Sequence, residues 1–346
     1  MRAVVFGDVG RVLVEDVPEP AIEEPGDAIL RVAVAAICGS DLHLYHGKAP
    51  VEPGATLGHE VVGVVEEVGS AVARFRPGDR VVASFAVACG ACWFCRAGQT
   101  ALCEDLRMLG LGVFGGGLAG AQAERVRIPV ADVNLLSVPE DVDDDRAVFL
   151  GDVLSTAYYG AAVAGVRAAE TVAVVGAGPV GFLAAQAAAA LGALRVLVLD
   201  LDPARLALAA GAGAEPVDVR ARNAEMAVAD ATAGRGADVV IEAVGTPAAY
   251  ETALSVVRRG GTVSVVGMYT SESVELQLGV AWARALRLQF AGICPVHAWW
   301  DRALAELRAG RLDPLPLVSH RLPLAEAPLG YRLFDRREAT KVLLRP

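Results

Sequence analysis

The chain carries no excess of positive charge. Its 346 residues include 31 lysines and arginines against 41 aspartates and glutamates, which gives a net charge of −10 and a pI near 5.1. An acidic surface attracts neither nucleic acid nor an anionic membrane, so we expect neither as a partner. Lysine itself is nearly missing. Only Lys48 and Lys341 are present, and we attribute the preference for arginine to coding bias.

Targeting and repetitive segments are also missing. The first residues, MRAVVFGDVGRVLVED, contain an apolar run that Asp8 interrupts and no small-residue cleavage site, so we expect no signal peptide. We find no internal repeat, low-complexity tract or linker. Six cysteines, four of them spaced as metal ligands, favour a reducing cytoplasm.

One apolar run resembles a membrane span in length. Residues 172–194 carry a single polar side chain, that of Gln186, and are long enough to cross a bilayer. Three glycines and a proline lie near the start of this run, and the β-rich sequence VLVLD follows it. These features favour a buried strand, a glycine turn and a buried helix over a membrane span.

Four cysteines are the most informative feature that the chain does have. They form the pattern C-x2-C-x2-C-x7-C and are Cys89, Cys92, Cys95 and Cys103. Gaps of two residues let tight turns, eased by Gly90 and Gly98, bring all sulfurs to one tetrahedral zinc ion. Two disulfides are the alternative, but thiols so spaced suit that geometry poorly. A four-thiolate site has no open position, so we expect it to be structural and place catalysis elsewhere.

The pattern of apolar residues changes once along the chain. Residues 1–150 contain β-branched runs, such as ILRVAVAAI and HEVVGVVEEVG, between Gly, Pro and Asp turns. From about residue 154, short buried strands alternate with Ala- and Leu-rich helices, which is typical of a parallel doubly wound sheet. After about residue 291 we expect two helices and the strand KVLLR. The first part is too short to close alone, so the C-terminal piece is expected to return to it.

A glycine motif predicts a dinucleotide site. Gly176, Gly178 and Gly181 form G-x-G-x-x-G between a strand and a helix, which allows a tight turn and close approach of a pyrophosphate. RVLVLD then ends at Asp200, where a carboxylate would bind the ribose hydroxyls and repel a 2′-phosphate. NAD is therefore favoured, although Arg205 nearby leaves NADP open. The alternative for Asp200 is a turn residue.

Cys38, in ICGSD, and His59, in GHEVVGVVEEVG, are candidates for a second metal site. With these residues the chain resembles the zinc-dependent medium-chain alcohol dehydrogenases over essentially its full length. The motifs that carry the resemblance are CGSDLH, GHEVVGVVEEVG, the four-cysteine segment, GDVLSTAYYG, VGAGPVG and ATKVLLRP. It is most similar to the bacterial branch of glutathione-independent formaldehyde dehydrogenases and broad-range NAD-dependent alcohol dehydrogenases of Thermus type.

The resemblance implies an α/β architecture of two domains. One is a GroES-like, β-rich catalytic domain formed by residues 1–153 and 292–346, with the structural-zinc lobe at about residues 86–106. The other is a Rossmann NAD-binding domain, a doubly wound parallel sheet, at residues 154–291. Two zinc ions per chain, one catalytic and one structural, and a homotetramer are implied as well.

The resemblance also assigns roles to individual residues. Cys38, His59 and Asp152 are the implied catalytic-zinc ligands, and Glu60 is a conditional one. Asp152 replaces the cysteine of the best-known members; the alternative is that it only caps the following helix. Ser40 and His43 are the implied proton relay. The implied cofactor contacts are Thr156, Gly176, Gly178, Pro179, Val180, Gly181, Asp200, Arg205, Val244 and Lys341.

The implied activity is reversible hydride transfer between a primary or secondary alcohol and NAD, giving an aldehyde or ketone. Dehydrogenases of polyols, threonine or formaldehyde are alternatives from the same family. A redox sensor that binds zinc and NAD without catalysis is the alternative of another class, but it would not need the ligands and the relay together. Phe94, Phe114, Phe149 and Leu111 are candidate pocket residues or, alternatively, core residues.

Overall fold

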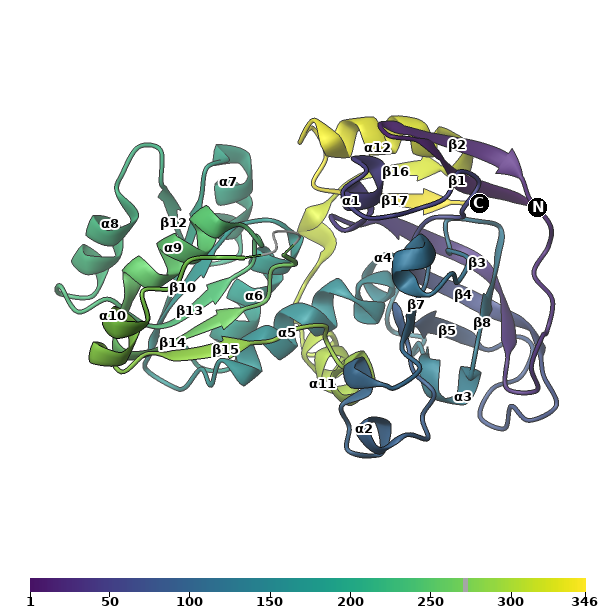
Figure 1. Cartoon of the computed structure of the whole chain (residues 1–346), viewed down its shortest axis with the longest axis horizontal. Coiled ribbons are helices and arrows are strands. Elements are labelled where there is room, and N and C mark those ends of the chain that lie inside the picture. Colours follow the sequence, from purple (N-terminus) through teal and green to yellow (C-terminus); the bar gives the residue numbers. More distant parts are fainter. Residues whose placement is uncertain (270–272) are drawn as a thin grey trace. The chain divides into compact units, whose positions relative to one another are not determined.

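The computed structural model describes residues 1–269 and 273–346, which divide into two compact units (Figure 1). Unit 1 contains Met1–Asp152, Pro295–Leu304 and Leu315–Pro346. Unit 2 contains Val153–Cys294 and Ala305–Pro314. Unit 1 is thus built from segments that lie on both sides of unit 2 in the sequence.

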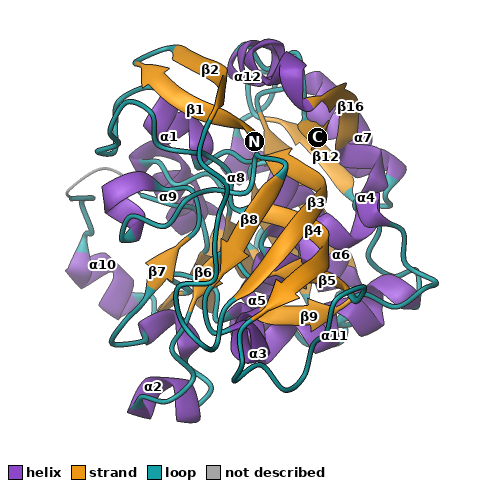
Figure 2. Cartoon of the chain, turned by 90° about the vertical axis from the view of Figure 1, so that its right-hand side faces the viewer, coloured by secondary structure: helices purple, strands orange, loops and turns teal. Residues whose placement is uncertain are grey.

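Unit 1 is organised around a seven-stranded sheet with the order β16-β17-β3-β4-β5-β9, and β8 also pairs with β3 (Figure 2). The strands are β3 (Ala28–Ile37), β4 (Glu60–Val68), β5 (Arg80–Ala83), β8 (Arg125–Ile128), β9 (Leu135–Ser137), β16 (Val318–Pro323) and β17 (Lys341–Arg345). The strands β16 and β17 are parallel, whereas β17, β3, β4, β5 and β9 pair antiparallel. The late strand β17 therefore lies inside the sheet.

The β-branched runs of unit 1 form strands because both of their faces can be buried. In β3, eight of ten residues are buried, and β17 is buried except at its last residue. One core cluster lies between β3, β4, β5 and β8, and a second joins β17 to the helix α12 (Ala327–Asp335) and the hairpin of β1 (Arg2–Asp8) with β2 (Arg11–Asp16). The latter core also covers α1 (Asp41–Tyr45), which follows β3.

The four-cysteine segment forms a lobe between two short paired strands, β6 (Ala86–Val87) and β7 (Arg107–Met108). It contains a single turn of helix, α2 (Trp93–Arg96), and the 3-10 turn η1 (Thr100–Leu102). The remaining short helices of unit 1 are η2 (Gly112–Gly115), α3 (Ala131–Asn134), α4 (Asp144–Ala147), η3 (Val148–Gly151), η4 (Leu315–Leu317) and η5 (Leu324–Glu326). The helix α11 (Val296–Arg308) contributes its first part to unit 1.

Unit 2 is a six-stranded parallel sheet with the order β12-β11-β10-β13-β14-β15. Its strands are β10 (Thr171–Val175), β11 (Arg195–Asp200), β12 (Glu215–Asp218), β13 (Ala237–Glu242), β14 (Val257–Val265) and β15 (Arg287–Phe290). Its helices are α5 (Val153–Val163), α6 (Pro179–Ala190), α7 (Pro203–Gly211), α8 (Ala224–Ala231), α9 (Pro247–Val256) and α10 (Leu278–Ala283). This order, which reverses direction between β10 and β13, is that of a Rossmann fold.

These two architectures confirm the predicted fold class. The apolar run of residues 172–194 forms β10, a glycine turn and α6, as the sequence indicated. Among the described residues, no helix has the length and apolarity needed to traverse a membrane. The strands β12 and β15 were not predicted, because they lie at the two edges of the sheet, where two of four residues in β12 and three of four in β15 are exposed.

Candidate functional site

Four side chains of unit 1 bring metal-binding atoms together: Cys38, His59, Glu60 and Asp152. One ligand atom from each lies within 4.8 Å of the others. Cys38 directly follows β3, Glu60 opens β4, and Asp152 follows η3. The first and last of these residues are 114 positions apart in the sequence, so the tertiary structure assembles the cluster. We call this set the Cys38 cluster.

Strand pairing and one glycine explain why these residues meet. Ala36 of β3 lies opposite Glu60 of β4 in an antiparallel register, so the end of β3 is adjacent to the start of β4. Gly151 passes so close to β5 that a Cβ atom there would lie 2.2 Å from the carbonyl oxygen of Ala83. Only glycine allows that approach, which carries Asp152 to the same edge of the sheet.

His59 is buried, with 2% of its side chain exposed, and both ring nitrogens face oxygen atoms. Nε2 lies 3.2 Å from Ser40 Oγ and 3.3 Å from Asp152 Oδ2. Nδ1 lies 3.2 Å from Asp41 Oδ1, which is close enough for an ion pair. The two atoms do not meet the geometry of a hydrogen bond. Burial alone would lower the pKa of His59, but the charge of Asp41 and the bond to Asp152 raise it well above the usual value. A proton on Nδ1, toward Asp41, would leave Nε2 free for a metal.

Glu60 is paired with a buried lysine. Lys341 Nζ donates to Glu60 Oε1 at 2.5 Å, and the two side chains are 1% and 0% exposed. The ammonium also lies 5.4 Å from the centre of the Phe149 ring. Burial alone would lower the pKa of Lys341, but Glu60 and Cys38 outweigh it and raise the pKa. The resemblance implied that Lys341 contacts the cofactor; that contact stays a prediction, and the partner found here is a carboxylate of unit 1.

The donor set of the Cys38 cluster fits zinc. A thiol, an imidazole and carboxylates are its usual ligands, and one thiolate plus one carboxylate balance its charge. Cys38 Sγ lies 3.7 Å from Asp152 Oδ2, and burial raises the pKa of the Cys38 thiol. Within the described part of the chain, Glu60 Oε2 is buried without a hydrogen-bond partner. A cation would satisfy such an atom.

The predicted relay residues lie on or beside α1. Ser40 is the N-cap residue of this helix, and its hydroxyl touches His59 as described above. His43 lies in the same helix and is partly buried. Burial, together with the neighbouring Lys48 and His46, lowers the pKa of His43. His43 is therefore neutral near pH 7 and able to accept a proton.

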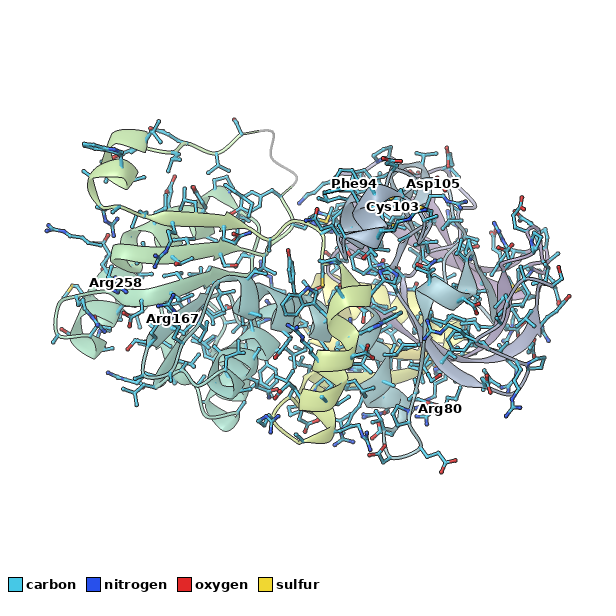
Figure 3. All side chains as sticks on the ribbon, turned by 90° about the horizontal axis from the view of Figure 1, so that it is seen from below. Arg80, Phe94, Cys103, Asp105, Arg167 and Arg258 are labelled. Atoms are coloured by element: carbon cyan, nitrogen blue, oxygen red, sulfur yellow. The ribbon has the colours of Figure 1, made fainter. Side chains whose placement is uncertain are left out.

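The four cysteines of the lobe converge as their spacing predicted. Their sulfurs lie within 4.8 Å of one another, and none is in a disulfide. Backbone N–H groups point at the sulfurs, for example from Cys92 to Cys89 Sγ and from Asp105 to Cys103 Sγ, both at 3.4 Å. Figure 3 shows Cys103 and Asp105 together with Phe94 on this lobe.

The hydrogen bonds of the lobe also act on the thiols. Backbone N–H groups of Glu104 and Cys95 lower the pKa of Cys92 to about 6, so this thiol is largely a thiolate at neutral pH. Burial raises the pKa of Cys95 to about 12. One thiol of the lobe thus ionises readily and another resists ionisation, so four thiolates together would need a cation such as a metal ion to balance their charge.

The glycine turn of unit 2 has the geometry that its motif predicted. Gly176 has φ +98°, where other residues are strained, and a Cβ atom on Gly181 would lie 1.9 Å from the Gly176 carbonyl oxygen. Pro179 is the first residue of α6 and Val180 follows it, while Gly178 at the N-cap provides no side-chain cap. The first amides of the helix are thus left for an anion.

The other predicted cofactor residues surround this turn or lie elsewhere in unit 2. Asp200 ends β11, and its carboxylate accepts from the N–H groups of Ala177 at 2.5 Å and Leu201 at 2.7 Å. Arg205 lies beside the turn, because one of its guanidinium nitrogens is 3.9 Å from a Cβ atom built on Gly178. Val244 contacts the same turn, with a methyl group 2.5 Å from a Cβ atom built on Gly176. Thr156 lies in α5.

Of the four aromatic and apolar candidates for a substrate pocket, two are buried in the core of unit 1 and two are not. Phe149 and Leu111 are buried in unit 1, with 0% and 5% exposed, and Leu111 belongs to the core that contains α12. Phe94 lies on the lobe and Phe114 is 49% exposed. The buried pair therefore contributes to packing.

Three buried polar residues with extensive hydrogen bonds were not singled out from the sequence. Gln122 and Tyr331 bond to each other and, through Gln122, to Asp41. Glu242, at the end of β13, accepts from the N–H groups of Val244 and Gly245 at 2.7 and 2.8 Å and so fixes the loop that touches Gly176. No short motif contains these residues, so the sequence offers no signal for them.

Comparisons with known proteins agree with this geometry. The family model "Alcohol dehydrogenase GroES-like domain" matches residues 24–140, and the model "Zinc-binding dehydrogenase" matches residues 179–307. Zinc-type alcohol dehydrogenase B of Aspergillus flavus is 37% identical to this chain over 353 aligned residues, which span 100% of this chain and 81% of the relative.

Solved structures of other dehydrogenases also superpose on this chain over its full length. Alcohol dehydrogenase TADH from Thermus sp. ATN1 superposes with a TM-score of 0.96 at 48% identity, covering 100% of this chain and 99% of that one. A protein from Sinorhizobium meliloti 1021 solved with NADP superposes with a TM-score of 0.87 at 33% identity, covering 100% and 99%.

Proposed function

The chain belongs to the zinc-dependent medium-chain alcohol dehydrogenase family, and from this premise we propose that it transfers hydride reversibly between a primary or secondary alcohol and NAD. The observation that carries the proposal is the Cys38 cluster, whose thiol, imidazole and carboxylate atoms lie within 4.8 Å of one another. Cys38, His59 and Asp152 would hold a catalytic zinc ion, with Glu60 as a conditional ligand. The four cysteines of the lobe would hold a structural one.

The residues around the cluster have separate tasks in this proposal. When bound, zinc supplies a Lewis acid that makes an alcohol hydroxyl acidic near neutral pH, and NAD accepts the hydride. Ser40, 3.2 Å from His59 Nε2, would accept a hydrogen bond from the substrate hydroxyl and release its own proton as it takes up the substrate's, and the neutral His43 would accept the released proton and pass it to solvent. Asp41 faces the other ring nitrogen of His59 and would keep the imidazole in the ligand orientation.

NAD is the proposed cofactor because of Asp200. Its carboxylate lies at the end of β11 and accepts from Ala177 in the glycine turn, so its negative charge would repel a 2′-phosphate. The neighbouring Arg205 and the NADP bound to the Sinorhizobium meliloti relative favour the alternative cofactor. Unit 2 would be the NAD-binding domain and unit 1 the catalytic domain.

A homo-oligomer, with a tetramer favoured over a dimer, is proposed through the edge of the unit 2 sheet. In the described part of the chain, β15 has a partner strand only on the β14 side. Its Phe290 is 66% exposed, and Leu278 and Trp282 of α10 are 71% and 82% exposed. An unpaired edge with exposed apolar side chains is suited to association with a second copy. Light scattering of the parent and of Trp282→Glu would test this, since the variant should have the smaller mass.

The enzymatic proposal is tested by NADH formation with simple alcohols, benzyl alcohol, polyols, threonine and formaldehyde. Asp152→Asn is the sharpest variant, because it keeps the size of the side chain and removes its charge. We expect it to stay folded, to lose one of two zinc ions and to lose turnover, and Asp152→Cys to recover some zinc. If the Asp152→Asn variant were fully active, Asp152 would not be a zinc ligand and would only cap the helix that follows it. No turnover on any substrate would favour the redox sensor.

A further inference from the structure

The carboxylate of Asp41 is buried, with 0% of the side chain exposed, and it is held on two sides. Oδ1 faces His59 Nδ1 at 3.2 Å. Oδ2 accepts from the backbone N–H of Cys38 at 2.9 Å and from Gln122 Nε2 at 3.2 Å. A buried carboxylate requires such donors, so removing one of them allows the carboxylate to change its position. Among the described residues, Gln122 provides the side-chain amide that donates to Asp41.

Gln122 is fully buried and uses every part of its amide. Its Nε2 group donates to Asp41 Oδ2 and to the carbonyl oxygen of Ala36 at 3.1 Å. Its Oε1 atom accepts from the Tyr331 hydroxyl at 2.9 Å. Since both acceptors on one side lack hydrogens, the NH2 group must point toward them, and the orientation of the amide is fixed.

The backbone of Gln122 is also held by hydrogen bonds, to the segments that contain Leu57 and Val4. Its N–H donates to the carbonyl oxygen of Leu57 at 2.9 Å, and its own carbonyl oxygen accepts from the N–H of Val4 at 2.8 Å. Leu57 precedes His59 by two residues, so the same residue that bonds to Asp41 also holds the segment that carries the imidazole. Gly58 between them has φ +93°, and a Cβ atom there would lie 2.3 Å from Gln122 Cγ. The glycine of the GHE motif is therefore required by Gln122.

Tyr331 extends this chain of hydrogen bonds to α12. Its side chain is 0% exposed, and its ring packs on that of Tyr45 with centroids 5.7 Å apart. Burial and the charge of Asp41 raise the pKa of Tyr331 well above its usual value, so the hydroxyl stays a donor. The hydroxyl fixes Oε1 of Gln122 and thereby directs the amide's NH2 group to Asp41.

We propose that Gln122 and Tyr331 are positioning residues for the metal ligand His59, acting through Asp41. The inference rests on the proposed function, because it takes Cys38, His59 and Asp152 as zinc ligands. Groups that orient a ligand histidine typically change metal affinity by about 10- to 100-fold when they are removed. The structure predicts that Gln122 contributes in this range although it does not touch the metal.

The test compares release of zinc to a chelator from the holoenzyme and from Gln122→Met, a variant of similar size without the amide. We expect the variant to lose the catalytic zinc about 10- to 100-fold more readily and to keep the zinc of the lobe. Substitution of cobalt at the Cys38 cluster gives a second readout, because a displaced imidazole shifts the cobalt absorption bands. Gln186→Met is the matched control, since Gln186 also bonds at both ends of its amide, to Asp313 in unit 2. It should change neither readout.

Tyr331→Phe keeps the experiment decisive if Gln122→Met does not fold. This variant should weaken zinc retention in the same direction by a smaller factor. Combined with Gln122→Met it should add almost nothing, because its effect passes through Gln122. A structural role alone would release both zinc ions and lower the stability of the whole protein, and that result would overturn the inference.

Two further results separate this inference from the proposed function. If the parent binds two zinc ions and Gln122→Met and Tyr331→Phe retain both as tightly as the parent does, the positioning role is refuted and the enzyme proposal stands. If the parent binds zinc only in the lobe, so that Cys38→Ser changes nothing, the proposed function fails and this inference fails with it.

Discussion

The buried pair of Lys341 and Glu60 gives the strongest prediction about stability. The variant Lys341→Met keeps a long side chain and removes the ammonium, which leaves Glu60 without the cation that now lies 2.5 Å away. Neither side chain has access to water, since they are 1% and 0% exposed. Water therefore cannot take the place of the lost partner, and the full cost of an unpaired buried carboxylate appears in the free energy of unfolding.

The expected loss is about 3–5 kcal/mol, the usual result of removing one partner from a buried ion pair. For a domain of roughly 150–250 residues, a loss of 1 kcal/mol lowers Tm by about 2–4 °C, so we expect a decrease of roughly 6–20 °C. Replacing both partners, as in Lys341→Met with Glu60→Leu, removes the unpaired charge and should recover most of the loss. The two substitutions are therefore expected to be strongly non-additive.

The assay is thermal and denaturant unfolding of four proteins with equal zinc in the lobe and none at the Cys38 cluster, where the metal would replace the lost ammonium. The four are the parent, the two single variants and the double variant. Lys48→Met is the matched control, because Lys48 is the only other lysine and is exposed. It should change the stability by no more than about 0.5 kcal/mol. A loss of less than about 1 kcal/mol in Lys341→Met, or a double variant as unstable as the sum of the singles, would refute the reasoning.

Three other predictions concern the metal and cofactor sites. Cys103→Ser should lose one zinc ion and much thermal stability, because a structural site contributes folding energy, and normal zinc content would contradict the structural site. Asp200→Ala should weaken NAD binding and shift preference toward NADP, and an unchanged ratio of the two dissociation constants would show that the ribose carboxylate lies elsewhere. The zinc affinity of the Cys38 cluster should increase as the pH rises, because zinc must displace protons from Cys38 and His59, whose pKa values are both raised without metal. The expected increase is about tenfold per pH unit for each proton displaced. Chelator competition at pH values from about 6 to about 8 measures this, and equal affinity at all of them would refute it.

In unit 2 the sequence predicted the strands that are buried on both faces and missed the two strands at the edges of the sheet. The runs that form β3 and β10 are apolar almost throughout, β13 has an apolar centre, and the structure buries all three. By contrast, β12 reads EPVD and β15 reads RLQF, and two of four residues in β12 and three of four in β15 are exposed. An edge strand is stabilised by hydrogen bonds to one neighbour, which leaves no hydrophobic pattern in its own sequence.

Some residues of the candidate site could be predicted from the sequence and others could not. Cys38, His59 and Asp152 lie in short motifs, so a resemblance between motifs is enough to associate them. Gln122 and Tyr331 are different, because they are separated by 209 positions from each other, and Gln122 by 81 from Asp41. Their roles depend on hydrogen bonds between distant segments, and neither a glutamine nor a tyrosine carries a local signal for such a bond.

The position of β17 inside the sheet of unit 1 has a consequence for biosynthesis. The ribosome makes β3, β4 and the four lobe cysteines before unit 2, and it makes α12 and β17 after unit 2. The lobe is contiguous in sequence, so a nascent chain already contains everything needed to capture its zinc. The Cys38 cluster must wait for Tyr331 and Lys341, both of which arrive with the last strand and helix. We therefore expect the two metals to be acquired in sequence during protein synthesis, the structural ion first.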